Sequence, residues 1–116
     1  MAAEPNVLRL YTRHDGKKPF QEWMDLLHYQ TQVRIAARLE RVRLGIFGDW
    51  KSLGEGVFEL RIDVGPGYSV YFGRDGKSIV ILLCGGSKAS QRKDISDAKM
   101  YWKDYRSFKN ATKRTV

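Results

Sequence analysis

Polar side chains recur at every second position in two neighbouring segments near the middle of the chain. Alternation with apolar residues is typical of strands that have one apolar and one polar face. Arg61 is the side chain on this face best suited to phosphate, because its planar donors pair two oxygens at once. The alternative is a surface arginine that pairs across the sheet with Glu59 or Asp63. The polar side chains of this face are Glu59, Arg61, Asp63, Ser69 and Tyr71.

A second group of cations is spaced along a predicted helix. Arg34, Arg38 and Arg41 follow one another at intervals of four and three residues, which places them on one side of the helix. Such a stripe is either a solvated face or a surface that contacts phosphates or a partner protein. In the second case its contribution to affinity falls as the salt concentration rises.

The chain offers little for histidine or metal chemistry. His14 is expected in a turn and His28 at a helix end, so neither shares the polar strand face. No spacing of histidine, aspartate and glutamate predicts a metal site. The single Cys84 excludes an internal disulfide and a cysteine-based zinc site. We expect neither a metal nor an organic cofactor.

Three helices are predicted from apolar residues at helical spacing. The first begins near Pro19, the second ends near Gly45, and the third follows Gly86, with Ser87 or Ser90 as its cap. The apolar positions are Phe20, Trp23, Met24 and Leu27 in the first helix, Ile35, Leu39, Val42 and Ile46 in the second, and Ile95, Ala98, Trp102 and Tyr105 in the third.

Four strands are predicted around these helices. They cover residues 7–12, 57–63, 68–73 and 79–84, and the last is apolar on both faces, which indicates the central strand. Trp50 is expected near a loop. The order strand, two helices, three strands, helix predicts an α+β fold with a small, mostly antiparallel sheet and the helical pair on one face. We expect the polar face to stay open beside the final helix, where strands hold its side chains rigidly.

The length of 116 residues fits one domain over residues 1–116, with a core over about residues 7–105 and a loose, basic tail over 106–116. The net charge of +8 is uneven, because residues 31–52 carry +3 and residues 85–116 carry +6. This pattern suits an acidic partner such as nucleic acid or an acidic protein.

No apolar run approaches the ~20 residues of a membrane span. The N-terminal sequence lacks the basic region and apolar core of a secretory signal. We therefore expect a cytoplasmic protein without membrane association.

A longer series of residues resembles one protein family. The series is FELRID at 58–63, GPGY at 65–68, VYFGRDG at 70–76 and LLCGGSK at 82–88, followed by Gln91, Asp94, Ile95 and Ala98. It resembles the RelE/ParE toxin superfamily, and most closely the HigB-like branch of phage-related addiction module killer proteins. The resemblance covers about residues 7–105 with the element order intact, and it implies a RelE-like fold.

The resemblance implies a type II toxin that a cognate antitoxin neutralises, often an antitoxin with a helix-turn-helix DNA-binding domain. Many relatives are metal-independent endoribonucleases that cut mRNA on the ribosome and stop translation. The ParE side of the superfamily inhibits DNA gyrase instead. One scaffold can host both activities, so a gyrase inhibitor and a catalytically degenerate, antitoxin-binding homologue remain alternatives to the mRNA interferase.

The resemblance also implies which residues form a site. The catalytic candidates are Arg61, Lys88, Gln91, Asp94 and position 69, and Asp94 is alternatively a first-turn acid favoured by the helix dipole. Candidates for RNA contact are Tyr71, Arg74, Arg92, Lys93, Arg34, Arg38 and Arg41. Tyr71 would stack on a base or relay a proton from the open face, or else pack across strands. Arg74 is expected in a hairpin turn.

Ser69 departs from the pattern of the family. The HigB-like branch has arginine after the Gly-Tyr pair, and this arginine is tied to phosphate contact in the RNase relatives. Losing a guanidinium there commonly removes several kcal/mol of transition-state stabilisation. Ser69 is therefore either a natural variant with weak or altered activity or a change that disarms a toxin, and Ser69→Arg is expected to restore or increase toxicity.

Overall fold

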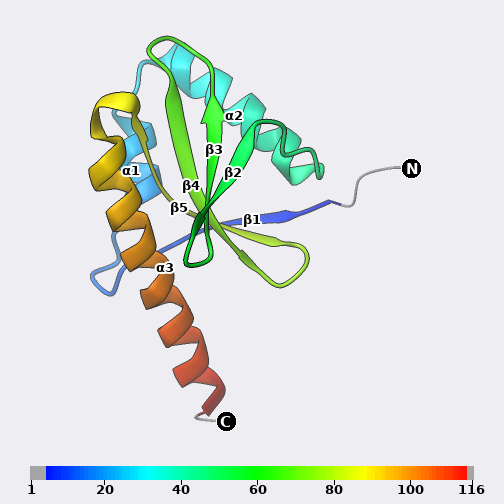
Figure 1. The fold of residues 1–116 in the computed structure, drawn as a ribbon, viewed down its shortest axis with the longest axis vertical. Helices are drawn as coiled ribbons and strands as arrows, with labels where there is room; N and C mark the ends of the chain where they lie inside the picture. The colour runs from blue at the N-terminus through cyan, green and yellow to red at the C-terminus, as the bar shows by residue number, and fades with distance from the viewer. Residues whose placement is uncertain (1–4, 115–116) are drawn as a thin grey trace.

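The structure is a computed structural model that describes residues 5–114 of the chain. Its elements follow in the order strand, two helices, four strands and a long helix (Figure 1). The fold is therefore α+β, as the sequence predicts. The elements are β1 Val7–Leu10, α1 Pro19–Asp25, α2 Tyr29–Arg43, β2 Trp50–Gly54, β3 Val57–Ile62, β4 Tyr68–Asp75, β5 Ile79–Ser87, a 3-10 turn Lys88–Ser90 and α3 Gln91–Arg114.

The strands form one mixed sheet in the order β1-β5-β4-β3-β2. Strands β2 to β5 pair antiparallel, and β1 lies parallel to β5. The middle position belongs to β4, whereas the sequence predicted the apolar β5 there. Strand β2 is an addition to the predicted order, with Trp50 opposite Leu60. Its sequence, Trp-Lys-Ser-Leu-Gly, shows no alternation of apolar and polar residues, so periodicity could not reveal it.

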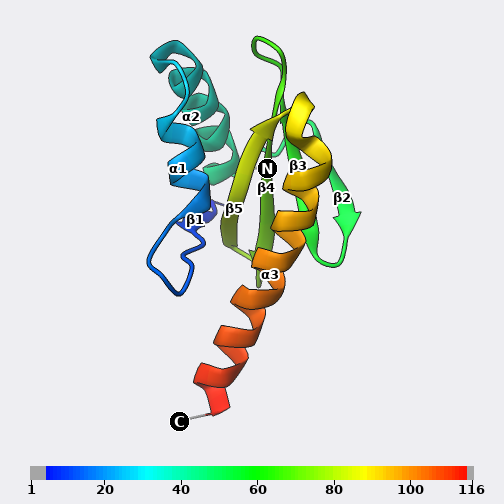
Figure 2. The same cartoon turned by 90° about the vertical axis from the view of Figure 1, so that its left-hand side faces the viewer.

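Helices α1 and α2 cover one face of the sheet (Figure 2). Pro19 begins α1, as predicted. Helix α2 ends at Arg43 because Gly45 takes a φ of 90°, and Ile46 therefore lies outside the helix and is exposed, contrary to the predicted pattern. This face holds an apolar core of Phe20, Ile35, Leu39, Val42, Leu60, Ile62, Val70, Phe72, Val80 and Leu82.

Helix α3 crosses the other face of the sheet (Figure 2). Its Trp102 lies flat against β4 at Gly73, where any side chain would collide with the indole ring. Glycine at this position therefore lets the helix approach the strand closely. The second core, under α3, consists of Tyr11, Val57, Tyr71, Ile81, Leu83, Cys84, Ala98 and Trp102.

Helix α3 continues through residue 114 and projects past the sheet (Figure 1). The sequence predicted a loose tail from residue 106, and residues 106–114 are helical instead. The Tyr105 hydroxyl donates to Asp75 at 2.5 Å, and Lys109 pairs with the same carboxylate. These contacts fasten the helix to the β4–β5 hairpin at the point where the predicted tail begins. In the stretch from residue 5 to residue 114, no helix is both long and apolar enough to cross a membrane.

Candidate functional site

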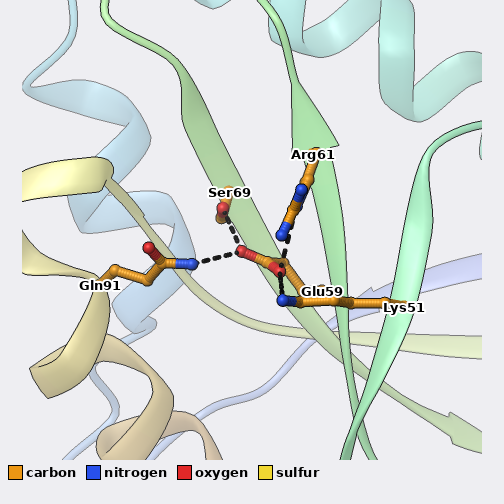
Figure 3. A network of polar contacts seen from close by, with 5 residues as sticks. All are labelled: Lys51, Glu59, Arg61, Ser69 and Gln91. Carbon is orange, nitrogen blue, oxygen red and sulfur yellow. Dashed lines mark hydrogen bonds and ion pairs between the residues drawn. The ribbon is translucent and has the colours of Figure 1, made fainter.

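Glu59, in the interior of β3, is the one charged residue among the described residues that is buried, with 0% of its surface exposed. Two neutral groups donate hydrogen bonds to its Oε2 atom. The Ser69 hydroxyl lies at 2.7 Å and the Gln91 side-chain amide at 3.0 Å (Figure 3). A buried carboxylate needs such donors, because burying it without partners costs several kcal/mol or more.

Two cations complete the surroundings of Glu59. The Arg61 Nε atom is 3.4 Å and the Lys51 Nζ atom 3.6 Å from its Oε1 atom (Figure 3). About half of each cationic side chain is exposed, whereas the carboxylate between them is not. The cations therefore combine a contact to a buried anion with access to solvent.

The sheet register explains why these residues meet. Lys51 of β2 lies directly opposite Glu59, and Ser69 of β4 lies directly opposite Arg61. Alternation along each strand turns all four side chains to the α3 face. Gln91 reaches the cluster because it is the first residue of α3.

An open groove of about 470 Å³ lies beside this cluster, within the usual size range of small-ligand sites. We call it the Glu59 groove. Two cations line it, Arg61 and the exposed Lys88, together with the carboxylates of Asp49, Glu59 and Asp63. The lining therefore contains more carboxylates than cations, and an anionic ligand would depend on contacts to Arg61 and Lys88.

Four of the five predicted catalytic positions line this groove, namely Arg61, Ser69, Lys88 and Gln91. They come from β3, β4, the 3-10 turn and α3, which are separate segments of the chain. The fold therefore brings these predicted residues together.

Asp94 is not among the residues that line the groove. Its carboxylate accepts a hydrogen bond from Ser90 at 2.5 Å and lies against Gly86, where a side chain would collide with it. Burial raises the pKa of Asp94 above its ordinary value. The contacts place Asp94 where the start of α3 meets β5. Ser87 makes no side-chain capping bond to the 3-10 turn, and the Ser90 hydroxyl is used by Asp94.

Tyr71 lies on the predicted face, but that face is not open at this point. The residue is 0% exposed beneath α3, and burial raises the pKa of its hydroxyl to about 12. A side chain covered in this way cannot stack on a nucleobase. The expectation of an open face at Tyr71 is therefore wrong, because the final helix crosses the face instead of lying beside it.

Arg74 belongs to β4 and not to the hairpin turn that the sequence predicted. Its guanidinium carbon lies 5.0 Å from the centre of the Phe47 ring, and its Nη2 donates to the Lys77 carbonyl at 2.9 Å. Arg74 does not line the Glu59 groove.

The three arginines of α2 do not form one free stripe. Arg38 donates a hydrogen bond to the Phe47 carbonyl, and burial lowers the pKa of its guanidinium. Arg34 and Arg41 are exposed, on the helix that covers the face opposite the groove.

The remaining basic and histidine candidates lie outside the groove. Arg92 is exposed next to Gln91, whereas Lys93 pairs with Asp97 at 2.8 Å. The His14 Nε2 atom lies 3.2 Å from Asp104, and His28 accepts the Gln30 backbone N–H at the start of α2. Among the described residues, no group of three or more histidines, cysteines or carboxylates could hold a metal ion.

The sequence analysis placed Glu59 on the polar strand face and named it as an alternative partner of Arg61, but it did not include Lys51. The available signal was the position of a carboxylate in the interior of the predicted strand FELRI, between two apolar residues. A charge in such a strand requires partners. Which side chains supply them depends on the register of β2 and on the path of α3.

Comparison with known proteins shows a family relationship but does not identify a function for the family. No family model matches the chain. A Haemophilus influenzae protein described as an uncharacterized protein is 48% identical over 82 residues, which cover 70% of this chain and 83% of that protein. The chain therefore belongs to the same protein family as this Haemophilus influenzae protein.

Proposed function

We propose that the protein is the toxin of a type II toxin–antitoxin pair and that it cleaves mRNA, on the ribosome, at the Glu59 groove. The observation that supports this most is the convergence of Arg61, Ser69, Lys88 and Gln91 on one groove beside a buried carboxylate. The resemblance to RelE/ParE toxins supplies the substrate class and the partner, a cognate antitoxin with a helix-turn-helix domain.

The proposed reaction uses the 2′-hydroxyl of the RNA as its nucleophile. The 2′-oxygen attacks the adjacent phosphorus, and the bond from phosphorus to the 5′-oxygen breaks. The products are a 2′,3′-cyclic phosphate and a 5′-hydroxyl end. This reaction needs a proton acceptor, stabilisation of the charge on the phosphate and a proton for the leaving oxygen.

Groups at the groove match these three roles. Glu59 has no exposed surface, so it positions Arg61 and does not touch the RNA. The proton of the 2′-hydroxyl goes to Asp63, a carboxylate that is exposed at the groove. Arg61 donates to the phosphate oxygens, and its contact with Glu59 keeps the guanidinium at the groove. Lys88, exposed at the end of β5, supplies the proton or the charge that the leaving 5′-oxygen requires.

Ser69 favours a second candidate function. In it, the protein is a catalytically degenerate homologue that binds its antitoxin and does not cleave RNA. The Ser69 hydroxyl is committed to Glu59, and the groove contains fewer cations than carboxylates. An arginine at this position would face the groove from β4, opposite Arg61. It would add the second guanidinium that the resemblance leads us to expect.

The test is induced expression of the wild type and of Ser69→Arg at equal protein levels while the 5′ ends of cellular mRNA are mapped. New mRNA ends are expected within minutes of induction. Ser69→Arg should increase cleavage by about tenfold or more, as expected for one added transition-state contact. The double variant Arg61→Ala/Lys88→Ala is the inactive control.

Other outcomes separate the alternatives. Growth arrest with intact mRNA in both forms would contradict the nuclease and favour a gyrase inhibitor. Normal growth and intact RNA with both forms would favour the degenerate, antitoxin-binding homologue.

A further inference from the structure

One flank of α3, on the side of the β2–β3 hairpin, carries a continuous stripe of polar and basic side chains. It runs away from the groove, because Arg92 follows Gln91 directly. At about 100° per residue, its members lie within about 40° of one line along the helix. We call this set the α3 stripe: Arg92, Ser96, Lys99, Lys103, Arg106 and Asn110.

The acidic residues of α3 lie off this stripe and are engaged elsewhere. Asp94 contacts Ser90, Asp97 pairs with Lys93, and Asp104 binds the side chains of Tyr11 and His14. The stripe therefore carries four positive charges and no negative charge of its own helix. This segregation of charge favours a polyanionic ligand.

The stripe borders a hollow in the surface. A cleft of about 380 Å³ is lined by Lys99, Lys103, Arg106 and Asn110 and by Glu55 at the tip of the β2–β3 hairpin. Lys99 pairs with Glu55 at 3.0 Å, whereas Lys103 and Arg106 have exposed side chains directed to solvent. The Glu59 groove lies at the first residue of α3, beside β3 and β4, and the cleft lies further along the same helix.

We infer that the α3 stripe binds the phosphates of the RNA strand that extends from the Glu59 groove. This inference rests on the proposed function for the substrate class. Cations one turn apart are about 6 Å apart along the helix axis, close to the separation of neighbouring phosphates in an extended strand. From Arg92 to Arg106 the stripe spans about 21 Å, so it contacts several nucleotides beyond the scissile bond.

The chemistry of the stripe favours RNA over an acidic protein. Protein interfaces usually bury an apolar centre, and the stripe contains no apolar residue. The exposed apolar residues of α3, Met100 and Phe108, lie on other sides of the helix. A positively charged track that follows a nucleic-acid backbone is the common design for single strands.

The test compares two double variants that remove the same charge. Lys103→Ala/Arg106→Ala changes the stripe far from the groove, and Arg34→Ala/Arg41→Ala changes exposed positions of α2. Alanine favours helix at all four positions, so both variants should fold, which circular dichroism verifies. Binding is measured by fluorescence anisotropy with 2′-O-methyl oligoribonucleotides of about 4 and about 16 nucleotides, which cannot be cleaved through the 2′-oxygen.

The stripe variant is expected to weaken binding of the longer oligonucleotide by about 5- to 20-fold and to reduce the salt slope by about 1 to 2. Binding of the short oligonucleotide should stay within about twofold of the wild type, and the α2 variant should leave both unchanged. An equal loss in both variants would overturn the inference, as would tighter binding of a poly-glutamate peptide than of RNA, or no dependence on RNA length.

Cleavage of unmodified RNA is measured in parallel, so that the two proposals fail separately. Stripe-dependent binding without cleavage would overturn the nuclease and leave the RNA track intact. Cleavage of long RNA that Lys103→Ala/Arg106→Ala does not affect would overturn the track and leave the nuclease intact.

Discussion

The two faces of the sheet differ in the chemistry that they bury. Under α1 and α2 the core consists of aliphatic and aromatic side chains. Under α3 the buried set includes the Glu59 carboxylate, the Tyr71 hydroxyl and the Cys84 thiol. Neighbouring residues of one strand, such as Glu59 and Leu60, are buried in these two different environments. The comparison indicates that one face mainly stabilises the fold, while the other places polar groups for a ligand at a cost in stability.

The largest expected effect is on RNA cleavage and comes from Glu59, on the face of the sheet under α3. Glu59→Gln keeps the size of the side chain and removes its charge, and it should lower RNA cleavage by about 10- to 100-fold, because Arg61 loses the anion that holds its guanidinium at the groove. The free energy of unfolding should change much less, because Lys51 and Arg61 stay half exposed and hydrated. Single-turnover cleavage and urea unfolding of the same preparation measure the two effects, and unchanged cleavage would contradict the role of Glu59.

The second largest effect is on the free energy of unfolding and is expected at Leu60, the next residue of β3. Leu60→Ala removes a side chain that is 1% exposed in the apolar core, and it should lower the free energy of unfolding by about 2–5 kcal/mol. Cleavage per folded molecule should stay within a fewfold of the wild type. A variant that lost cleavage while remaining fully folded would show that the apolar face also controls the site.

A third expectation concerns how tightly α3 covers its face. Burial raises the pKa of the Cys84 thiol well above its ordinary value, and thiolate is the reactive form. Modification by a disulfide reagent at neutral pH should therefore be slower than in denaturant by a factor of about 10² or more. Fast modification of the native protein would show that α3 lifts from the sheet.

The smallest effect is expected at Asp94. Its folded-state pKa is raised by burial, so the stability that comes from the protonated form is full below the unfolded pKa and is lost as the pH rises through the folded pKa. Asp94→Asn should stabilise the protein at neutral pH by roughly a few tenths of a kcal/mol, since the carboxylate is partly screened. The gain should vanish in acid. Urea unfolding from about pH 3 to about pH 7 tests this, and a uniform loss of stability would contradict it.

The alternation of polar and apolar residues along the strands predicted which face of the sheet each side chain lies on, but not which helix covers that face. It placed Glu59 and Arg61 of β3 and Tyr71 of β4 on one side of the sheet, which the structure confirms. It could not show that α3 crosses this side, because the path of a helix depends on packing such as that of Trp102 on Gly73.

Errors at the ends of elements also have local causes. Residues 106–114 have few apolar side chains, and the tertiary contacts of Tyr105 and Lys109 with Asp75 hold the neighbouring turns of α3. Strand β2 forms by pairing with β3 and contains a register shift near Gly54. Both features depend on distant partners that no local pattern reveals.

The parallel pairing of β1 with β5 determines how early the chain can fold while it is being synthesised. Val7 lies opposite Ile79, so the first strand has no partner until most of the chain has been made. At about 5–20 residues per second, β1 leaves the ribosome several seconds before β5. Gln91 follows later still, so the Glu59 groove is complete only after the chain has been made through this residue. A nascent copy whose Gln91 has not yet left the ribosome therefore has no complete site.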